Sequence, residues 1–493
     1  MAAVTVAVVG GGLLVIAPGM LVVSLAALAL ASAVVSRPAV AAYVLIGATP
    51  LTAGIDRGLL IPFLRPNEAL AVLVGGALVL RWLPRLLTER PLTVRLRRTD
   101  ATIVAMGITS SLLPLLWMLL RGKVITVDDL LYALTLWKYY GLFLIIRASV
   151  RTQAQIRRCL VLGMASAAIV AIIAILQSLK LFGVPQLLAY YYAAFGNVDA
   201  LEISRGSSTL SLPVAVADLM TFNIAVAWAW LARDRRRQGA LYAAMALFVL
   251  GTLASGQFSG AIALVLCALA LAFIAGRAQP LVASIPMAFV ASIVLRPVIL
   301  NRLSGFSSPE GLPESWVARL DNLRSYFWPE LFSNFNFVLG VRPSARVPTS
   351  SPWQRYVWIE SGYTWLLWAG GIPFLLSFLY FLWENIRFTL SRARRRMDIV
   401  GVAATGSCVS LVIVGVLMMF DPHLTYRGSG DFLFALLALA TCGIGTEADD
   451  TQRDPPELGE RPRAPTTPTK PEAADGQTPG AAGGAAGRGQ PRR

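Results

Sequence analysis

The stretch YVWIESGYTWLLWAGGIPF, from Tyr356 to Phe374, contains the pattern that decides the fold. Its tryptophans and leucines are apolar enough to enter a lipid bilayer, although the preceding segment is rich in arginine and proline. A carboxylate, Glu360, stands where the apolar run begins. The stretch therefore predicts a membrane-spanning helix with an acidic group at its mouth.

Similar apolar runs fill most of the chain. It has 493 residues, of which 56% are hydrophobic and 14% are charged. A helix of about 20 apolar residues crosses a hydrocarbon core of about 30 Å with its backbone groups paired internally. The composition therefore predicts an all-α polytopic membrane protein and argues against a soluble globular protein. The formal charge of +16 comes from arginines at the ends of apolar runs, which is typical of membrane topology and not of a nucleic-acid-binding face.

We expect about 12–14 membrane-spanning helices within residues 1–446, and the N-terminal run reads as retained spans because it lacks a basic start and a cleavage site. Residues 447–493 have almost no large apolar side chains and predict a disordered cytoplasmic tail. The expected spans are 2–17, 19–35, 38–54, 67–82, 101–120, 125–146, 157–178, 212–232, 239–254, 258–275, 281–298, 357–383, 399–420 and 431–446.

Arginines gather in alternate loops, at 81–98, 147–158, 233–237 and 387–396. The positive-inside rule places these loops in the cytoplasm, so we expect a multi-pass protein of the cell membrane with both termini inside. Two outer loops, about 179–211 and 299–356, are long and aromatic, which favours folded structure. These loops are the candidate active face.

Several outer-loop arginines depart from this distribution. Arg205 lies in the polar turn SRGSSTLSLPVA, Arg319 lies in the amphipathic segment WVARLDNLRSYFWPELF, and Arg342 follows it. Solvated loop arginines are the simplest interpretation, since long loops cross the membrane largely regardless of charge. A guanidinium also pairs bidentately with phosphate oxygens, so the alternative is a phosphate-bearing ligand.

The order of five segments resembles the O-antigen ligase and O-antigen polymerase superfamily. The resemblance covers about residues 200–375, and the earlier spans match only in number and hydrophobicity. The segments are SRGSSTLSLPVAVA (204–217), LASGQFSGAIALVL (253–266), WVARLDN (316–322), FNFVLGVRP (335–343) and IESGYTWLLWAGGIPF (359–374).

This resemblance implies a membrane glycosyltransferase with a GT-C-like helical fold. Its substrates would be a glycan donor on undecaprenyl pyrophosphate and a glycan or glycolipid acceptor, joined outside the membrane during cell-surface polysaccharide assembly. Arg205 and Arg319 match the family's loop arginines, and Gly340 and Gly371 match its glycines. Glu360 stands where many members have a histidine, and Gly256–Ser259 replaces a Ser-Arg pair, so a proton-handling role and one phosphate contact are not carried over directly.

Two interpretations of Glu360 remain open. A glutamate near a helix N-terminus is stabilised by the macrodipole by about 0.3–1 kcal/mol and can accept from free backbone amides. Alternatively, Glu360 is the base for an acceptor hydroxyl, with Arg205 and Arg319 stabilising the leaving pyrophosphate. Tyr363 would then share its helical face and orient it or a sugar.

His423, the chain's single histidine, is the second candidate base, and a polar turn residue is the alternative. Asp218 is expected to pair with an outer arginine, and Lys138 and Glu384 are expected to face the bundle or an interface. With one histidine and no CxxC spacing, the sequence predicts no metal and no cofactor.

Two other classes of function fit many of these features. A polysaccharide transporter or lipid flippase also has many spans, but it should show repeated halves and interrupted helices, which the sequence does not. A structural partner for other polysaccharide machinery is the third alternative. Whether the chain acts as a polymerase or a ligase stays open.

Overall fold

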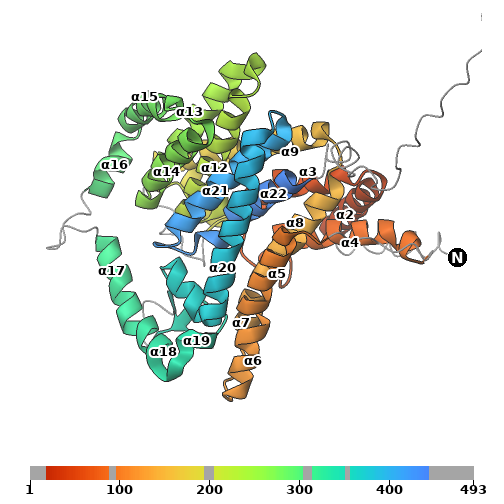
Figure 1. Ribbon diagram of the computed structural model, residues 1–493, viewed down its shortest axis with the longest axis vertical. Coiled ribbons are helices and arrows are strands. Elements are labelled where there is room, and N and C mark those ends of the chain that lie inside the picture. Colours follow the sequence, from red (N-terminus) through yellow and green to blue (C-terminus); the bar gives the residue numbers. More distant parts are fainter. Residues whose placement is uncertain (1–17, 88–95, 194–204, 304–313, 350–355, 443–493) are drawn as a thin grey trace, which may run out of the picture. The chain divides into compact units, whose positions relative to one another are not determined.

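The computed structural model describes residues 18–87, 96–193, 205–303, 314–349 and 356–442. Within these ranges the chain is mostly helical, and its sheet is a single two-stranded hairpin (Figure 1). The expected span 2–17, the expected tail 447–493 and parts of both outer loops lie outside the described residues.

In the described ranges, nine helical segments are long and apolar enough to cross a membrane, and four shorter apolar helices accompany them. This is the pattern of a multi-pass membrane protein. The nine segments are Pro66–Leu83, Arg98–Leu120, Val127–Ser149, Gln153–Ser178, Pro213–Leu231, Arg235–Ala254, Phe258–Ala275, Gly362–Arg395 and Ile399–Leu417. The shorter helices are Val22–Ser36, Ala39–Thr52, Ile285–Val294 and Ser429–Thr441.

The bundle helices, in chain order, are α2 (Pro18–Ser36), α3 (Ala39–Thr52), α4 (Pro66–Leu87), α5 (Arg98–Ser110), α6 (Leu112–Leu120), α7 (Val127–Ala133), α8 (Thr135–Ser149), α9 (Gln153–Ser178), α10 (Val184–Tyr191), α12 (Pro213–Leu231), α13 (Gln238–Ala254), α14 (Phe258–Ala275), α15 (Gln279–Val294), α16 (Arg296–Leu303), α20 (Gly362–Arg395), α21 (Ile399–Leu417) and α22 (Ser429–Thr441). The second outer loop contains α17 (Glu314–Asn322), the π-helix η4 (Leu323–Phe327), α18 (Trp328–Phe332), η5 (Ser333–Phe335), α19 (Asn336–Leu339) and the strands β1 (Arg346–Pro348) and β2 (Tyr356–Trp358). Short 3₁₀ turns are η2 (Ser208–Leu210), η3 (Arg235–Arg237) and η6 (His423–Thr425).

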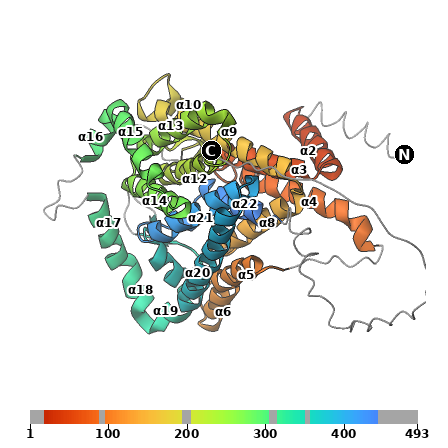
Figure 2. The same cartoon turned by 45° about the horizontal axis from the view of Figure 1, so that its top comes forward.

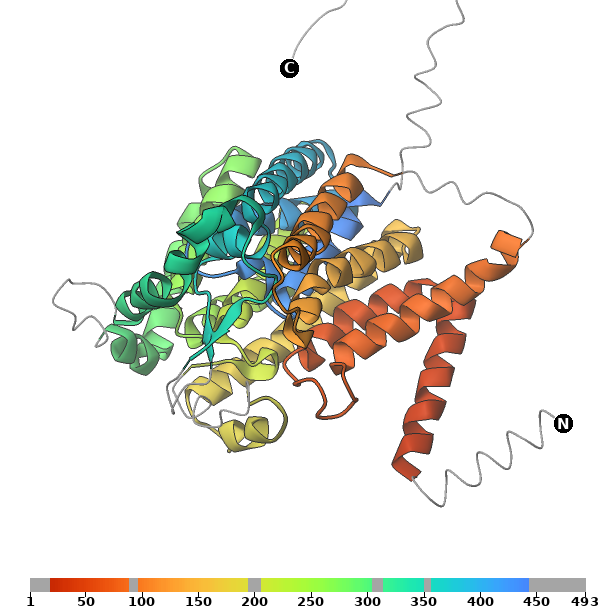
Figure 3. The ribbon, with the colours of Figure 1, turned by 90° about the horizontal axis from the view of Figure 1, so that it is seen from below.

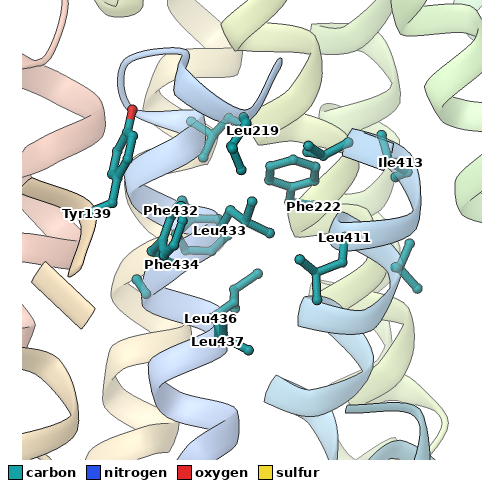
Figure 4. Packing of buried hydrophobic residues seen from close by; sticks show 14 of the residues in the cluster. Tyr139, Leu219, Phe222, Leu411, Ile413, Phe432, Leu433, Phe434, Leu436 and Leu437 are labelled. Carbon is teal, nitrogen blue, oxygen red and sulfur yellow. The ribbon is translucent and has the colours of Figure 1, made fainter. Parts of the chain in front are cut away.

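Three helices, α12, α21 and α22, form the centre of the bundle, with α8, α9, α13, α14 and α20 around them (Figure 2). In α12, 94% of the apolar segment is buried, so this helix faces protein on all sides. In α14 the buried share is 28%, so this helix exposes a lipid-facing stripe. Figure 4 shows Phe222 of α12, Leu411 of α21 and Phe434 of α22 in the core. The Phe434 ring also stacks on Tyr139, with centroids 5.0 Å apart.

Most expected spans coincide with helices to within a few residues, but three are broken. The span 101–120 is interrupted at Ser111, between α5 and α6, and the span 125–146 is interrupted at Leu134, between α7 and α8. The span 281–298 is interrupted at Leu295, between α15 and α16. The first two breaks each leave the two pieces within one candidate crossing, whereas at the third only Ile285–Val294 is an apolar helix.

The expected span 357–383 is wrong at both ends. Its first residues form β2 and an extended turn, because Ser361 caps the helix: its Oγ accepts from the backbone N–H of Thr364 at 3.4 Å. The helix α20 then runs to Arg395, so most of the predicted inner loop 384–398 is helical. The polar residues of its second half stay helical because α20 packs along α5 and α21.

Arginines at the predicted inner ends have a structural role. Arg233 donates to the carbonyls of Ala229 and Ala393, and Arg392 donates to that of Ala440 at 2.5 Å. These carbonyls belong to the last turns of α12, α20 and α22, where the helix leaves its acceptors unpaired and carries partial negative charge. The arginines that predict topology therefore also cap helix C-termini.

Two glycines join the outer loop to α20. Gly340 and Gly371 have φ values of +91° and +65°. A Cβ on Gly371 would lie 2.4 Å from the carbonyl oxygen of Val338, so only glycine permits this approach. The Val341 amide then donates to the Trp368 carbonyl at 2.7 Å, which fixes the loop on the first turns of α20.

Single cysteines test the topology. In a variant without the four native cysteines, Phe335→Cys should react with a membrane-impermeant thiol reagent in intact cells and Met397→Cys should react only after lysis. Both positions are well exposed, so access and not burial decides labelling. Labelling of Met397→Cys in intact cells with protection of Phe335→Cys would reverse the assigned orientation.

Candidate functional site

Arg319 lies between two carboxylates. Its Nη1 donates to Asp421 Oδ2 at 2.8 Å, and its Nε lies 3.6 Å from Glu360 Oε1. Burial by itself would lower the pKa of the guanidinium, but Asp421 and then Glu360 outweigh it and raise the pKa above its ordinary value. Three segments distant in sequence therefore meet at one cation.

The helix α17 is positioned by an aromatic contact on the face that carries Arg319. Trp316 precedes Arg319 by three residues, so the two side chains share a face of the helix. The Trp316 ring packs against Phe420, with centroids 5.2 Å apart, and against Phe258, with centroids 6.4 Å apart. Since Phe420 directly precedes Asp421, the same packing brings the carboxylate to the guanidinium.

Glu360 is not the cap of α20. Ser361 fills that position, and Glu360 precedes it at the end of the β2 segment, with its side chain 35% exposed. Burial raises the pKa of Glu360; Arg319 opposes the shift, Asp421 reinforces it, and a hydrogen bond with Asn322 opposes it. A partly accessible carboxylate with a raised pKa has the properties of a general base.

Arg205 supplies a second guanidinium near Arg319. Its pKa is lowered by burial and then by repulsion from Arg319, and its Nε is buried without a hydrogen-bond partner among the described residues. Next to it, a Cβ on Gly206 would lie 2.6 Å from the Ala174 carbonyl, so the turn packs directly on α9. Two neighbouring guanidiniums that repel each other favour an anionic ligand.

The polar turn after Arg205 is anchored by its hydroxyl groups. Ser208 Oγ donates to the Val170 carbonyl and Ser211 Oγ donates to the Gly54 carbonyl, each within 2.9 Å. Gln177 accepts from the Ser208 amide at 2.8 Å. The Ser/Thr-rich sequence is therefore needed because its side chains pair with backbone groups inside the bundle.

His423 and Asp218 form a buried pair. His423 Nδ1 lies 2.8 Å from Asp218 Oδ2, both side chains are 0% exposed, and Nδ1–H donates to the carboxylate when Asp218 is ionised. The expectation that Asp218 pairs with an outer arginine is wrong, because η6 places His423 directly against it. His423 Nε2 is buried with no hydrogen-bond partner in the described part of the chain. The His423 amide donates to the Asp421 carbonyl at 2.7 Å. The pair of His423 and Asp218 therefore fixes the turn that carries Asp421.

Two residues predicted to belong to the site, Arg342 and Tyr363, form contacts elsewhere in the structure. Arg342 donates to Asp129 from Nε at 2.9 Å and from Nη2 at 2.6 Å, and this hydrogen bonding raises the pKa of Arg342. Tyr363 donates from its hydroxyl to the Gly415 carbonyl at 2.8 Å. The shared helical face expected for Glu360 and Tyr363 is wrong, because Glu360 is extended and precedes the helix.

The intramembrane charges are paired. Lys138 Nζ lies 3.1 Å from Asp431 Oδ1, and Arg98 lies 3.8 Å from Glu384. The sequence predicted that Lys138 and Glu384 face the bundle or an interface, and their partly buried side chains agree with this.

Sequence reasoning missed Asp421 as a member of the site; its position in an Asp-Pro turn between the last two spans was the available signal.

No protein-family model matches the chain, and no curated protein matches it significantly.

The buried pair generates a stability prediction. Asp218→Ala or His423→Ala should each lower the free energy of unfolding by about 1–3 kcal/mol, because the remaining partner is left unsatisfied. The double variant should lose less than the sum of the two. Thermal unfolding in detergent measures this; fully additive losses would mean that the two side chains do not interact.

Proposed function

We propose that this chain transfers or polymerises an oligosaccharide carried on undecaprenyl pyrophosphate, at the outer face of the cell membrane, with a GT-C-like arrangement of its helices. The observation that supports the proposal most is the contact between Arg319 and Glu360. Arg205 lies close enough to Arg319 for the two guanidiniums to repel each other. One partly exposed carboxylate and two cations are the groups that this reaction needs.

In the proposed reaction, an acceptor hydroxyl oxygen bonds to the anomeric carbon of the donor sugar. The bond from that carbon to the pyrophosphate oxygen breaks, and its electron pair leaves with undecaprenyl pyrophosphate. The hydroxyl proton passes to Glu360. Arg205 and Arg319 stabilise the charge that develops on the leaving group.

The contact between Glu360 and Arg319 couples these two events. With Glu360 ionised, the cluster of Arg205, Arg319, Glu360 and Asp421 has two positive and two negative side chains and no net charge. When Glu360 accepts the proton, the net charge becomes +1 and Arg319 loses one of its two anionic partners. Arg319 keeps Asp421 as a partner, and the side that faced Glu360 becomes available to the pyrophosphate at the step where negative charge appears there.

Substitution of Glu360 tests the base directly. Glu360→Gln should reduce glycan transfer by about 10²–10⁴-fold, the range for loss of a general base. Glu360→His should retain more transfer than Glu360→Gln, because imidazole can still accept a proton. The matched control is Glu384→Gln, the same change in the second half of α20, which should transfer normally. Lipid-linked glycan that crosses the membrane without transfer in the wild type would instead indicate a flippase.

The same variant should not be less stable. The pKa of Glu360 is raised in the fold, so its contribution to stability is complete below the ordinary carboxylate pKa and is lost as pH rises through the raised value. Glutamine avoids that loss, so Glu360→Gln should melt at the wild-type temperature or above it at neutral pH. A large fall in melting temperature would attribute the loss of transfer to misfolding.

Arg205→Lys tests the pyrophosphate contact. Lysine keeps the charge but loses the bidentate fork, so donor use should fall about ten- to a hundredfold, since a hydrogen bond to a charged group contributes about 1.5–3 kcal/mol. Arg324→Lys, an exposed arginine of η4, is the control and should have no effect. Wild-type kinetics in Arg205→Lys would leave Arg205 as a packing residue of its turn.

A further inference from the structure

The strand β2 presents alternate side chains to opposite faces. Val357 and Ile359 are buried, whereas Tyr356, Trp358 and Glu360 are partly exposed. Residues two apart on an extended segment share a face and lie about 6.6 Å apart along it. Two aromatic rings therefore lead in a row to the carboxylate of Glu360. Figure 3 shows the hairpin of β1 and β2 from below.

Charged and polar neighbours fix the two rings. Arg346, which faces Trp358 across the hairpin, ion-pairs with Asp128 and places its guanidinium carbon 4.3 Å from the centroid of the Tyr356 ring. Trp358 hydrogen-bonds with the hydroxyl of Tyr132. The Tyr356 and Trp358 centroids lie 6.4 Å apart with the planes at 59°. Since Asp128 and Tyr132 both come from α7, a bundle helix sets the orientation of both rings.

We propose that Tyr356 and Trp358 form a subsite for the sugar rings of the acceptor glycan. The inference rests on the proposed function. In it, the acceptor of the transfer is a chain of sugars that lies along β2. The apolar C–H face of a pyranose packs on an aromatic ring, and its hydroxyl groups remain available to Arg346 and Asp128. The sugar nearest the end of the strand then presents a hydroxyl to Glu360.

The chemistry beside the rings favours a glycan over a lipid chain. Aromatic side chains at a membrane surface are commonly an interfacial belt. Here, however, the Arg346 guanidinium, which is paired with Asp128, lies over the Tyr356 ring, and Glu360 ends the row. An acyl chain would remove water from these groups without replacing their hydrogen bonds, which is costly, whereas a sugar supplies hydroxyl groups.

Direct binding tests the subsite. The probe is the set of neutral oligosaccharides released by mild acid from the surface polysaccharide of the organism that encodes the chain, without lipid or pyrophosphate. Titration calorimetry on protein in nanodiscs should show binding to the wild type and at least tenfold weaker binding to Trp358→Leu and Tyr356→Leu. Phe332→Leu, an exposed aromatic of α18 away from the strand, should bind as the wild type does. Trp358→Phe keeps a ring and should restore most of the binding, which separates ring stacking from misfolding.

Transfer kinetics separate this inference from the proposed function. The leucine variants should raise KM for the acceptor with little change in kcat, whereas Glu360→Gln should bind the oligosaccharides normally and fail in transfer. Absence of oligosaccharide binding by the wild type, or equal binding by all variants, would overturn the subsite. Binding that depends on Trp358 in a protein without any transfer would support the subsite and contradict the proposed function.

Discussion

The candidate site depends on the pairing of one partly buried guanidinium. Arg319 is largely removed from solvent, and such a charge is stable only with an anionic partner. Asp421, 5% exposed, and Glu360 supply that charge from two other segments. As a result the loop helix α17, the turn before α22 and the start of α20 are held together. The candidate base acquires its cationic neighbour through the same contact.

Rigid helices support this arrangement from inside the bundle. The turn that carries Asp421 is fixed by His423, whose ring is held by Asp218 on the fully packed helix α12. The turn that carries Arg205 is anchored by serine hydroxyls to α9 and to the end of α3. The candidate site residues in these turns are therefore held by packing against buried helices and do not lie on free loops.

Apolar runs predicted most of the fold from sequence alone, because the length of hydrocarbon that a helix must cross is a strong constraint. They failed at 357–361, where alternation of Val357 and Ile359 makes a strand, and hydropathy does not distinguish an apolar strand from a helix start. Arg205, Arg319, Glu360 and His423 were proposed as site residues from residue type and resemblance. Their pairing was not, because Asp218 and His423 are 205 residues apart and Arg319 and Asp421 are 102 apart. A single sequence contains no signal for such contacts.

The proposed function requires Arg205 and Arg319 to hold the pyrophosphate of a lipid-linked donor beside Glu360. A structure of the purified protein in nanodiscs with undecaprenyl pyrophosphate tests it most directly. Phosphate oxygens should lie at about 3 Å from both guanidiniums, and the contact between Arg319 and Glu360 should be longer than in the free protein. An ordered pyrophosphate elsewhere, with Arg319 still held by both Asp421 and Glu360, would contradict it.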